Sequence, residues 1–164
     1  MQTPRIVDMA SEQLVGLSVE MSYTNNMTGW LWGQFMPRRH EIKNLVSQDK
    51  YSLQVFSADF DWYTADPDTQ FVKWAAMAVT HSTEVPSGMA TLTLEGGQYA
   101  VFVHRGLASE FLITLHYILE TWMPTSGYVP DTSRPQFEIL GEKYRRDDPK
   151  SEEEIWFPIK KKTI

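Results

Sequence analysis

Near its C-terminal end the chain reads Ser151-Glu152-Glu153-Glu154-Ile155-Trp156-Phe157-Pro158-Ile159, a segment with the alternating character of a β-strand. Alternate residues of a strand point to the same face of a sheet, so Glu154 and Trp156 are expected on one side. A carboxylate beside an aromatic ring suits an organic cation, because the ring quadrupole and the carboxylate both attract positive charge. A second interpretation stays open, in which Glu154 is one of three solvated glutamates and Trp156 belongs to the core.

The first half of the chain reads as strand, helix, strand and strand. Its strands are indicated by alternating or continuous apolar residues over 12–23, 51–56 and 71–79. Between the first two, Met27, Leu31 and Phe35 recur at helical spacing and predict a helix. Pro37 interrupts that helix, but proline is favoured at a first helical position, so a second helical turn is expected after it at an angle.

The second half repeats this order of elements. Its strands are predicted over 89–95, 98–104, 136–140 and 154–159. Gly96-Gly97 separates the first two of these, so the segment is either one bent strand or two short ones. Ser109 can cap a helix whose apolar residues recur at spacings of three and four, namely Phe111, Leu115, Ile118 and Trp122.

These elements predict a pseudo-symmetric α+β domain in which two helices pack on an antiparallel sheet. The chain has 164 residues, which suits one domain over 1–164, with pseudo-repeats at about 10–80 and 88–161. The repetition is one of element order, since the two halves share no obvious residue identity.

Composition narrows the classes of partner. The net charge of −6 disfavours a phosphate backbone, so direct binding of nucleic acid is not expected. Cysteine is absent, which excludes disulfides and thiolate sites and favours a reducing cytoplasm. No apolar run reaches the length of a signal peptide or a membrane span, so a cytoplasmic location without membrane contact is expected.

The sequence points to binding chemistry more than to metal or cofactor chemistry. Aromatic residues make up 13% of the chain, which indicates either a large core or a lined cavity. The four histidines show no metal-ligand spacing, and neither a nucleophile elbow nor a phosphate-binding glycine loop is present, so no metal or cofactor is expected.

Several segments in order resemble the GyrI-like, or effector-binding, domain family, a duplicated βαββ fold with a central cleft. The family occurs alone and behind the DNA-binding domains of multidrug-responsive regulators. The resemblance covers nearly the whole chain and rests on residues 31–42, Val85-Pro86-Ser87-Gly88-Met89, 96–106, Trp122-Met123-Pro124-Thr125-Ser126-Gly127-Tyr128, Arg134-Pro135-Gln136-Phe137-Glu138 and Glu154-Ile155-Trp156-Phe157-Pro158-Ile159.

The resemblance implies a ligand held in the cleft between the two repeats. The family's buried carboxylate lies on the final strand, and Glu154 matches that position. The walls are implied to be apolar side chains of the first helix and of the strands around Trp74 and Phe137. No tri-helical DNA-reading segment fits before the first strand, so control of transcription by this chain alone is not expected.

Other wall candidates lie on the two helices. Trp30 and Trp32 are two residues apart and cannot share a helix face, and Trp32 is favoured for the cleft. Phe35 on the same helix and Trp122 on the second helix fit either the core or the wall.

Three functions remain open at this level. The first is a cytosolic binding protein for hydrophobic, cationic small molecules, of the kind that senses a transcription effector, with Glu154 as charge partner. The second is a hydrolase of strained, electrophilic cyclopropane-bearing compounds, with Glu154 as general base. The third is a gyrase-inhibitor-like protein whose acidic surface engages a protein partner.

Overall fold

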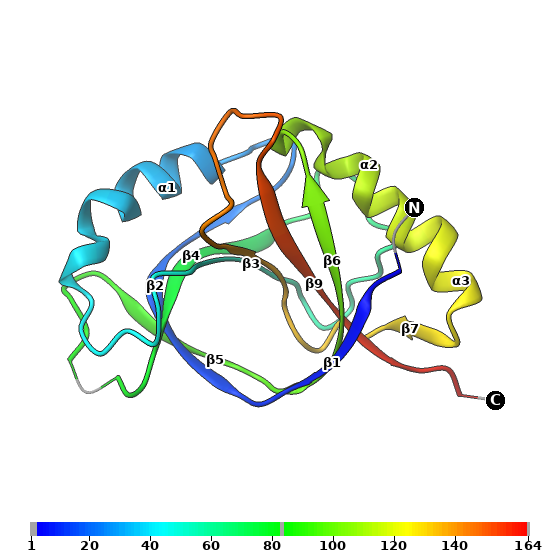
Figure 1. Cartoon of the computed structure of the whole chain (residues 1–164), viewed down its shortest axis with the longest axis horizontal. Coiled ribbons are helices and arrows are strands. Elements are labelled where there is room, and N and C mark those ends of the chain that lie inside the picture. Colours follow the sequence, from blue (N-terminus) through cyan, green and yellow to red (C-terminus); the bar gives the residue numbers. More distant parts are fainter. Residues whose placement is uncertain (1–2, 83, 164) are drawn as a thin grey trace.

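The described residues form nine β-strands and two helical segments, and both helical segments lie on the same side of the sheet (Figure 1). The computed structural model describes residues 3–82 and 84–163, so residue 83 and the ends of the expected domain 1–164 lie outside it. The strands are β1 Arg5–Met9, β2 Glu12–Met21, β3 Lys50–Val55, β4 Phe71–Val79, β5 Ala90–Leu94, β6 Gly97–Arg105, β7 Tyr128–Pro130, β8 Gln136–Leu140 and β9 Glu152–Lys161.

The strand order confirms the duplicated βαββ architecture. The sheet runs β1-β6-β9-β8-β3-β4-β2-β5, with β7 paired to β9, and every pairing is antiparallel. The series β2, α1, β3, β4 is followed by β6, α2, β8, β9, and the two series meet where β3 pairs with β8. The exact repeat boundaries, 10–80 and 88–161, stay a prediction.

A two-stranded ribbon links the two halves. β1 leads into β2 but pairs with β6, while β5 leads into β6 but pairs with β2. The register is continuous from the Arg5–Val101 pair to the Gly16–Ala90 pair. The ribbon bends at Gly96, where a Cβ would lie 2.5 Å from the Met9 carbonyl oxygen, so a residue without a side chain is required there.

The first helical segment contains α1, Thr28–Phe35, followed by the 3₁₀ helix Met36–Glu41. The change of helix type at Pro37 agrees with the expected interruption, because proline cannot supply the amide that would continue the α-helix. The second segment contains a 3₁₀ turn at Ala108–Glu110, α2 Phe111–His116, a π-helical turn and α3 Met123–Thr125. No helix among the described residues is long and apolar enough to cross a lipid bilayer.

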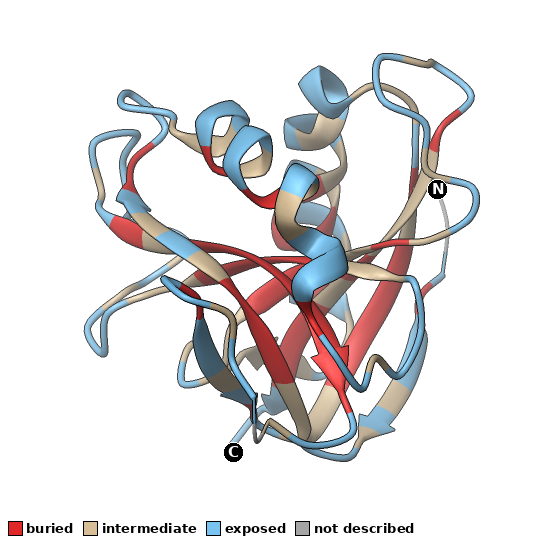
Figure 2. Ribbon diagram, turned by 90° about the vertical axis from the view of Figure 1, so that its left-hand side faces the viewer, coloured by how far each residue is buried: buried red, intermediate tan, exposed pale blue. Residues whose placement is uncertain are grey.

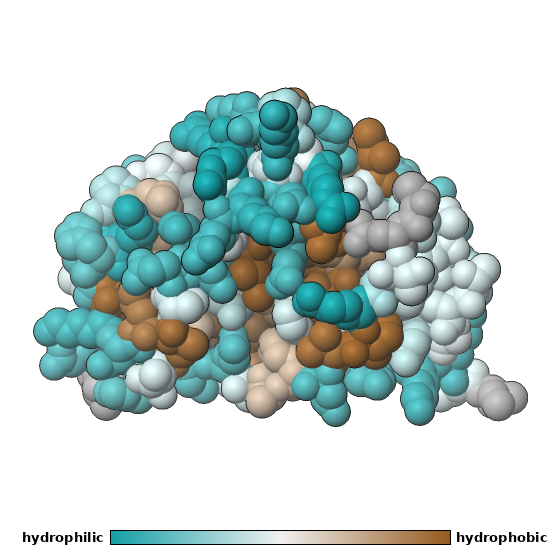
Figure 3. All heavy atoms as spheres, viewed as in Figure 1, coloured by the Kyte–Doolittle hydropathy of each residue, from teal (hydrophilic) through white to brown (hydrophobic). Residues whose placement is uncertain are grey.

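The sheet carries apolar clusters on both faces, as the buried strands in Figure 2 illustrate. On one face α1 covers a cluster around Phe35 and Met77, and the second helical segment covers another around Phe102 and Phe157. The opposite face holds a third cluster with Trp74 and nine further buried residues. In the view of Figure 1, hydrophobic residues are visible in the lower half of the molecule, and hydrophilic residues gather around the loop at its top (Figure 3).

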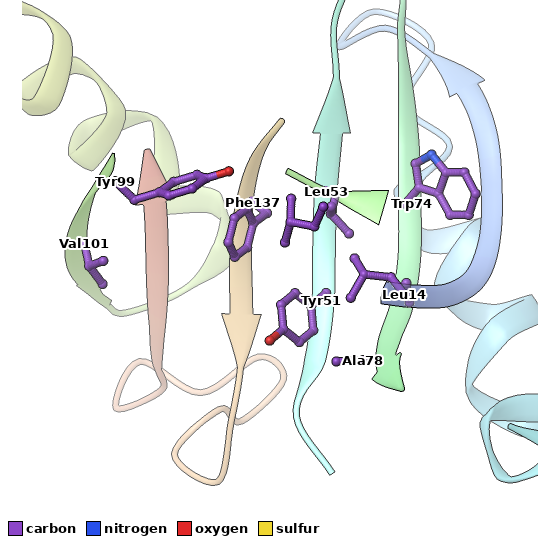
Figure 4. Packing of buried hydrophobic residues seen from close by; sticks show 10 residues of the cluster. Leu14, Tyr51, Leu53, Trp74, Ala78, Tyr99, Val101 and Phe137 are labelled. Atoms are coloured by element: carbon purple, nitrogen blue, oxygen red, sulfur yellow. The ribbon is translucent and has the colours of Figure 1, made fainter. Parts of the chain in front are cut away.

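The third cluster forms because paired residues on neighbouring strands share a face. Val101, Trp156, Phe137, Leu53 and Trp74 follow one another in register across β6, β9, β8, β3 and β4. Figure 4 shows the labelled members of this cluster side by side on the sheet. Phe137 stacks on Trp156 with ring centroids 5.5 Å apart, so this row is packed core.

Two strands, β1 and β7, were not expected from the sequence. β7 is only three residues long, and β1 is a short edge segment with three exposed residues, so neither has a clear periodic signal.

Close packing of β2 on β4 makes Gly16 a sensitive position. A Cβ at Gly16 would lie 2.0 Å from the Ala75 carbonyl oxygen, so we expect Gly16→Ala to lower the free energy of unfolding by about 2 kcal/mol or more. Gly33→Ala is the matched control, since a Cβ there meets nothing within 4 Å, and it should raise stability by about 0.5–1 kcal/mol. Urea unfolding measures both, and equal stability of the two variants would contradict this account of the packing.

Candidate functional site

A cavity of about 940 Å³ lies on the helix-covered face of the sheet, between the two helical segments. α1 forms one wall, and Ala108 and Phe111 at the start of the second segment form the other. Strands β3, β4, β8 and β9 supply the floor, and the segment 141–146 borders the opening. Figure 1 shows the orange loop that contains this segment between α1 and α2.

The wall formed by α1 is open because two of its residues are glycines. Gly29 and Gly33 are four residues apart and lie on one helix face, and a Cβ at either would meet nothing within 4 Å. Each glycine weakens a helix interior by about 1 kcal/mol relative to alanine, a cost that leaves space beside the cavity. Trp32 and Met36 complete this wall, whereas Trp30 points elsewhere and is 53% exposed.

The floor is polar, which is unusual for the centre of a sheet. Lys73 pairs with Gln54, and Gln54 pairs with Gln136, so these three side chains share the face that bears the cavity. Glu138 lies one pair further along the same face and is 7% exposed. Glu153 joins them from β9 and also lines the cavity.

A hydrogen-bond network holds these groups in place. The Lys73 ammonium donates to Oε1 of Gln54, and Nε2 of Gln54 donates to Gln136 Oε1 at 2.6 Å and to Glu138 Oε2 at 3.1 Å. Nε2 of Gln136 also donates to Glu138 Oε2. Gln54 therefore bridges a buried ammonium and a buried carboxylate, and each amide satisfies charged groups that burial would otherwise leave unpaired.

Burial shifts the protonation of all three ionisable groups on the floor. Desolvation raises the pKa of Glu138, although the charge of Lys73 and the two glutamine hydrogen bonds oppose it. Desolvation, helped by the negative charge of Glu138, raises the pKa of Glu153 to about 7. Desolvation also lowers the pKa of Lys73, against the opposing charges of Glu138 and Glu153. Burial thus shifts each of the three groups toward its neutral form, while the neighbouring charges and hydrogen bonds partly oppose that shift for Glu138 and Lys73.

Aromatic rings surround this floor. Tyr23 and Phe71 line the cavity with ring centroids 5.6 Å apart, and Trp32, Phe111 and Tyr144 line it from other elements. Rings exclude water and present a negative face to a cation, so the site combines carboxylates with an apolar enclosure.

Buried His104 positions the wall that carries Phe111. Its Nε2 donates to the Leu107 carbonyl oxygen at 2.9 Å, and its Nδ1 lies 2.9 Å from the Thr114 hydroxyl oxygen. These bonds attach the start of the second helical segment to β6, which fixes the distance between that helix and the cavity floor.

Glu154 and Trp156 lie on the opposite face of the sheet from this cavity. They do share a side, as expected, and Trp156 Nε1 donates to Glu154 Oε1 at 3.1 Å. Glu154 also pairs with Arg5 at 3.1 Å, and its side chain is 35% exposed. The expectation that Glu154 is buried in the cleft is therefore corrected, because Glu138 and Glu153 occupy the helix-covered face. A contact of Glu154 with a ligand stays a prediction.

Of the other side chains expected at the ligand, one lines the cavity, and that one is Trp32. Trp74 and Phe137 belong to the core on the far face of the sheet. Phe35 is fully buried under α1, and Trp122 packs edge-on against Phe102. A contact of these residues with a ligand stays a prediction, but their observed neighbours are core residues.

A second, charged groove of about 480 Å³ lies beside the first and contains Glu154. Arg5, Arg105 and Glu152 also line it, and Arg105 pairs with Glu152 at 2.6 Å. Glu153 borders both spaces, because the sheet ends there and β8 leaves β9. The groove is smaller and its charged residues pair with one another, so the larger cavity is the stronger candidate site.

Comparisons with known proteins agree with this architecture. A family model described as the GyrI-like small molecule binding domain matches residues 2–160. The transcriptional regulator BrlR of Pseudomonas aeruginosa is 28% identical over 156 residues, which are 94% of this chain and 54% of the regulator. The chain therefore spans about half the length of that curated relative.

Solved structures share the fold at low identity. SAV2435 bound to tetraphenylphosphonium superposes with a TM-score of 0.65 at 17% identity, covering 97% of this chain and 94% of that one. The EcmrR C-terminal domain gives 0.71 at 11% identity, covering 96% and 97%. A hydrolase from Listeria innocua gives 0.61 at 14% identity, covering 96% and 92%.

The raised pKa of Glu153 has a consequence for stability. Between pH 4.5 and about 7 the native state keeps a proton that an ordinary glutamate in the unfolded chain has released, so stability should fall as pH rises through this window and then level off. Glu138 acts in the same direction, while Lys73 and His104 face the same region. We expect Glu153→Gln to flatten the fall, as measured by urea unfolding at pH 5, 6, 7 and 8.

Glu154→Gln is the matched control for this measurement, because the Glu154 carboxylate lies outside the cavity and pairs with Arg5. It should keep the wild-type pH dependence. A Glu153→Gln variant with the full wild-type slope would contradict the placement of Glu153 in a desolvated site.

Proposed function

The chain belongs to the GyrI-like small molecule binding domain family, and from this premise we propose that the cavity between α1 and α2 binds hydrophobic organic cations. The observation that carries the proposal is the pair of desolvated carboxylates, Glu138 and Glu153, on the floor of an aromatic cavity. The family assignment supports a small-molecule ligand. The carboxylates support its charge.

The charge preference of the cavity follows from the ionised form of Glu153. Burial disfavours that form, and a cation within a few ångströms restores it, so binding of the cation and loss of the proton are coupled. A neutral ligand gains only the apolar contacts with Trp32, Phe71 and the other rings. The site should therefore discriminate by charge as well as by size, and more strongly above pH 7 than below it.

Relatives support the same class of ligand and suggest a use for it. SAV2435, which shares the fold, binds tetraphenylphosphonium, a bulky aromatic cation. The family relative BrlR is a transcriptional regulator almost twice as long as the matched region. We propose that this chain is a cytoplasmic ligand sensor or sequestering protein, and that any reading of DNA falls to a separate segment or partner.

A hydrolase is the alternative that one specific observation favours. A glutamate with a pKa of about 7 can act as a general base near neutral pH, and Glu153 meets this condition inside the cavity, whereas Glu154 does not lie there. Turnover of an electrophilic cyclopropane-bearing substrate, abolished in Glu153→Gln, would favour hydrolysis. Saturable binding of the same compound without turnover would favour the sensor.

Tetraphenylphosphonium tests the charge requirement directly. We expect Glu153→Gln and Glu138→Gln each to weaken its binding about tenfold or more, because each variant removes one negative charge close to the cation in a partly desolvated site. Triphenylphosphine oxide, a neutral analogue, should lose little affinity. Isothermal titration calorimetry at pH 8 measures both ligands.

The matched control is again Glu154→Gln, one residue away on the same strand but on the other face. It should bind tetraphenylphosphonium as the wild type does. If Glu154→Gln abolished binding while Glu153→Gln did not, the ligand would have to occupy the charged groove, and the proposal for the larger cavity would be abandoned.

Steric occlusion provides a test that does not depend on charge. Gly33 faces open space beside Trp32, so a leucine at this position should project into the cavity without a clash in the helix. We expect Gly33→Leu to weaken the charged and the neutral ligand alike by about tenfold or more, because both lose the volume that they occupy. Unchanged binding of both ligands, in a variant that melts no earlier than the wild type, would place the ligand elsewhere.

A further inference from the structure

We propose that Lys73 is a built-in counter-charge that sets the valence of the ligand, so that the cavity takes monovalent cations and rejects divalent ones. This inference rests on the proposed function of the same cavity. Lys73 supplies positive charge to a site for positive ligands, and this charge by itself opposes the binding of any cation.

The position of Lys73 makes it part of the cavity. It lines the space, yet the residue is only 7% exposed, and its ammonium is fixed by a hydrogen bond to Oε1 of Gln54. A long lysine side chain on an exposed strand would extend into water instead. Here the charge stays on the floor, where water screens it poorly.

The charges that Lys73 meets are the two carboxylates of the same floor. Gln54 accepts a hydrogen bond from Lys73 and donates one from its Nε2 to Glu138 Oε2 at 3.1 Å. The negative charges of both Glu138 and Glu153 act on Lys73. When both carboxylates are ionised and Lys73 is protonated, the floor carries a net charge of −1. One positive charge on a ligand neutralises it.

Other basic side chains at the cavity lie at its rim. Arg145 and Arg146 are exposed, and Lys50 is half-buried beside the opening. Exposed charges are screened by solvent and salt, so they change the selection of ligand charge far less than a buried group does. Lys73 is therefore the residue whose removal should change valence selection.

Lys73 disfavours a second positive charge on the ligand. The first charge of a dication neutralises the net charge of the floor, and Lys73 repels the second, which has no further carboxylate on the floor to attract it; Glu142, which also lines the cavity, is exposed and screened by solvent. Without Lys73 the floor carries −2, which favours the second charge. The ratio of the two affinities therefore reports on Lys73 even when the absolute affinities change for other reasons.

Ethidium and propidium provide matched probes, since they share one aromatic ring system and differ in one added quaternary ammonium group. We expect the wild type to prefer ethidium in fluorescence titrations at pH 8. We expect Lys73→Gln to raise the ratio of propidium affinity to ethidium affinity about tenfold or more. Glutamine removes the charge but keeps an N–H donor for Gln54, so the network retains a partner at this position.

A double variant makes the test independent of the effect of any single substitution on folding. Lys73→Gln combined with Glu138→Gln removes one charge of each sign and restores the net −1, so the wild-type preference should return. Arg146→Gln, at the rim, is the control and should leave the ratio within about twofold of the wild type.

The outcomes separate the two proposals. If the wild type binds ethidium but Lys73→Gln leaves the ratio unchanged, valence selection by Lys73 is refuted and the cation site stands. If the double variant behaves like Lys73→Gln alone, the charge count is wrong. If the wild type binds neither ethidium, propidium nor tetraphenylphosphonium, the proposed function fails and this inference with it.

Discussion

The register between β8 and β9 is the constraint on which the candidate site depends. Glu138 pairs with Ile155, and Ile139 pairs with Glu154, so Glu138 and Glu154 point to opposite faces, whereas Glu153 shares the face of Glu138. A slip of one residue would exchange the two sets of side chains and bring Glu154 and Trp156 under the helices. The row of rings that includes Phe137 and Trp156 on the far face opposes such a slip, because the slip would separate Trp156 from Phe137 and the rest of that cluster. The packed core on one face thereby fixes the chemistry on the other.

Burying three ionisable groups is costly, and the fold offsets this cost in two ways. Gln54 and Gln136 supply hydrogen bonds to Lys73 and Glu138, so the charged atoms are not left unpaired. The apolar clusters under α1 and under the second helical segment flank the polar floor and stabilise the sheet on either side of it. The polar floor is thus confined to the gap between the helices, where the ligand cavity opens.

The sequence was sufficient for most elements of the fold and insufficient for most of the site. Alternation placed β2, β3 and β9, and helical spacing placed α1, because each has a regular apolar pattern. The same alternation in β9 could not say whether Glu153 or Glu154 faces the helices, since parity is decided by pairing with β8 and β6. A usable signal was present in Lys73, a lone charge within the apolar run Phe71–Val79, and in Gln136 and Glu138, two polar residues at alternate positions. A charge inside an otherwise buried strand indicates a partner or a ligand, and this signal is independent of the tryptophans.

The exchanged ribbon bears on how such a molecule arose. Each half of the sheet is completed by a strand that precedes the other half, since β1 lies on β6 and β5 lies on β2. A single repeat on its own would leave β2 or β6 with a bare edge, and bare edges recruit a second copy of the same chain. Two copies of a single repeat would cover these edges by exchanging their leading strands in a symmetric homodimer. After gene fusion the two copies of the central strands could diverge in sequence. One copy then supplies the ammonium of Lys73, and the other supplies the carboxylates of Glu138 and Glu153.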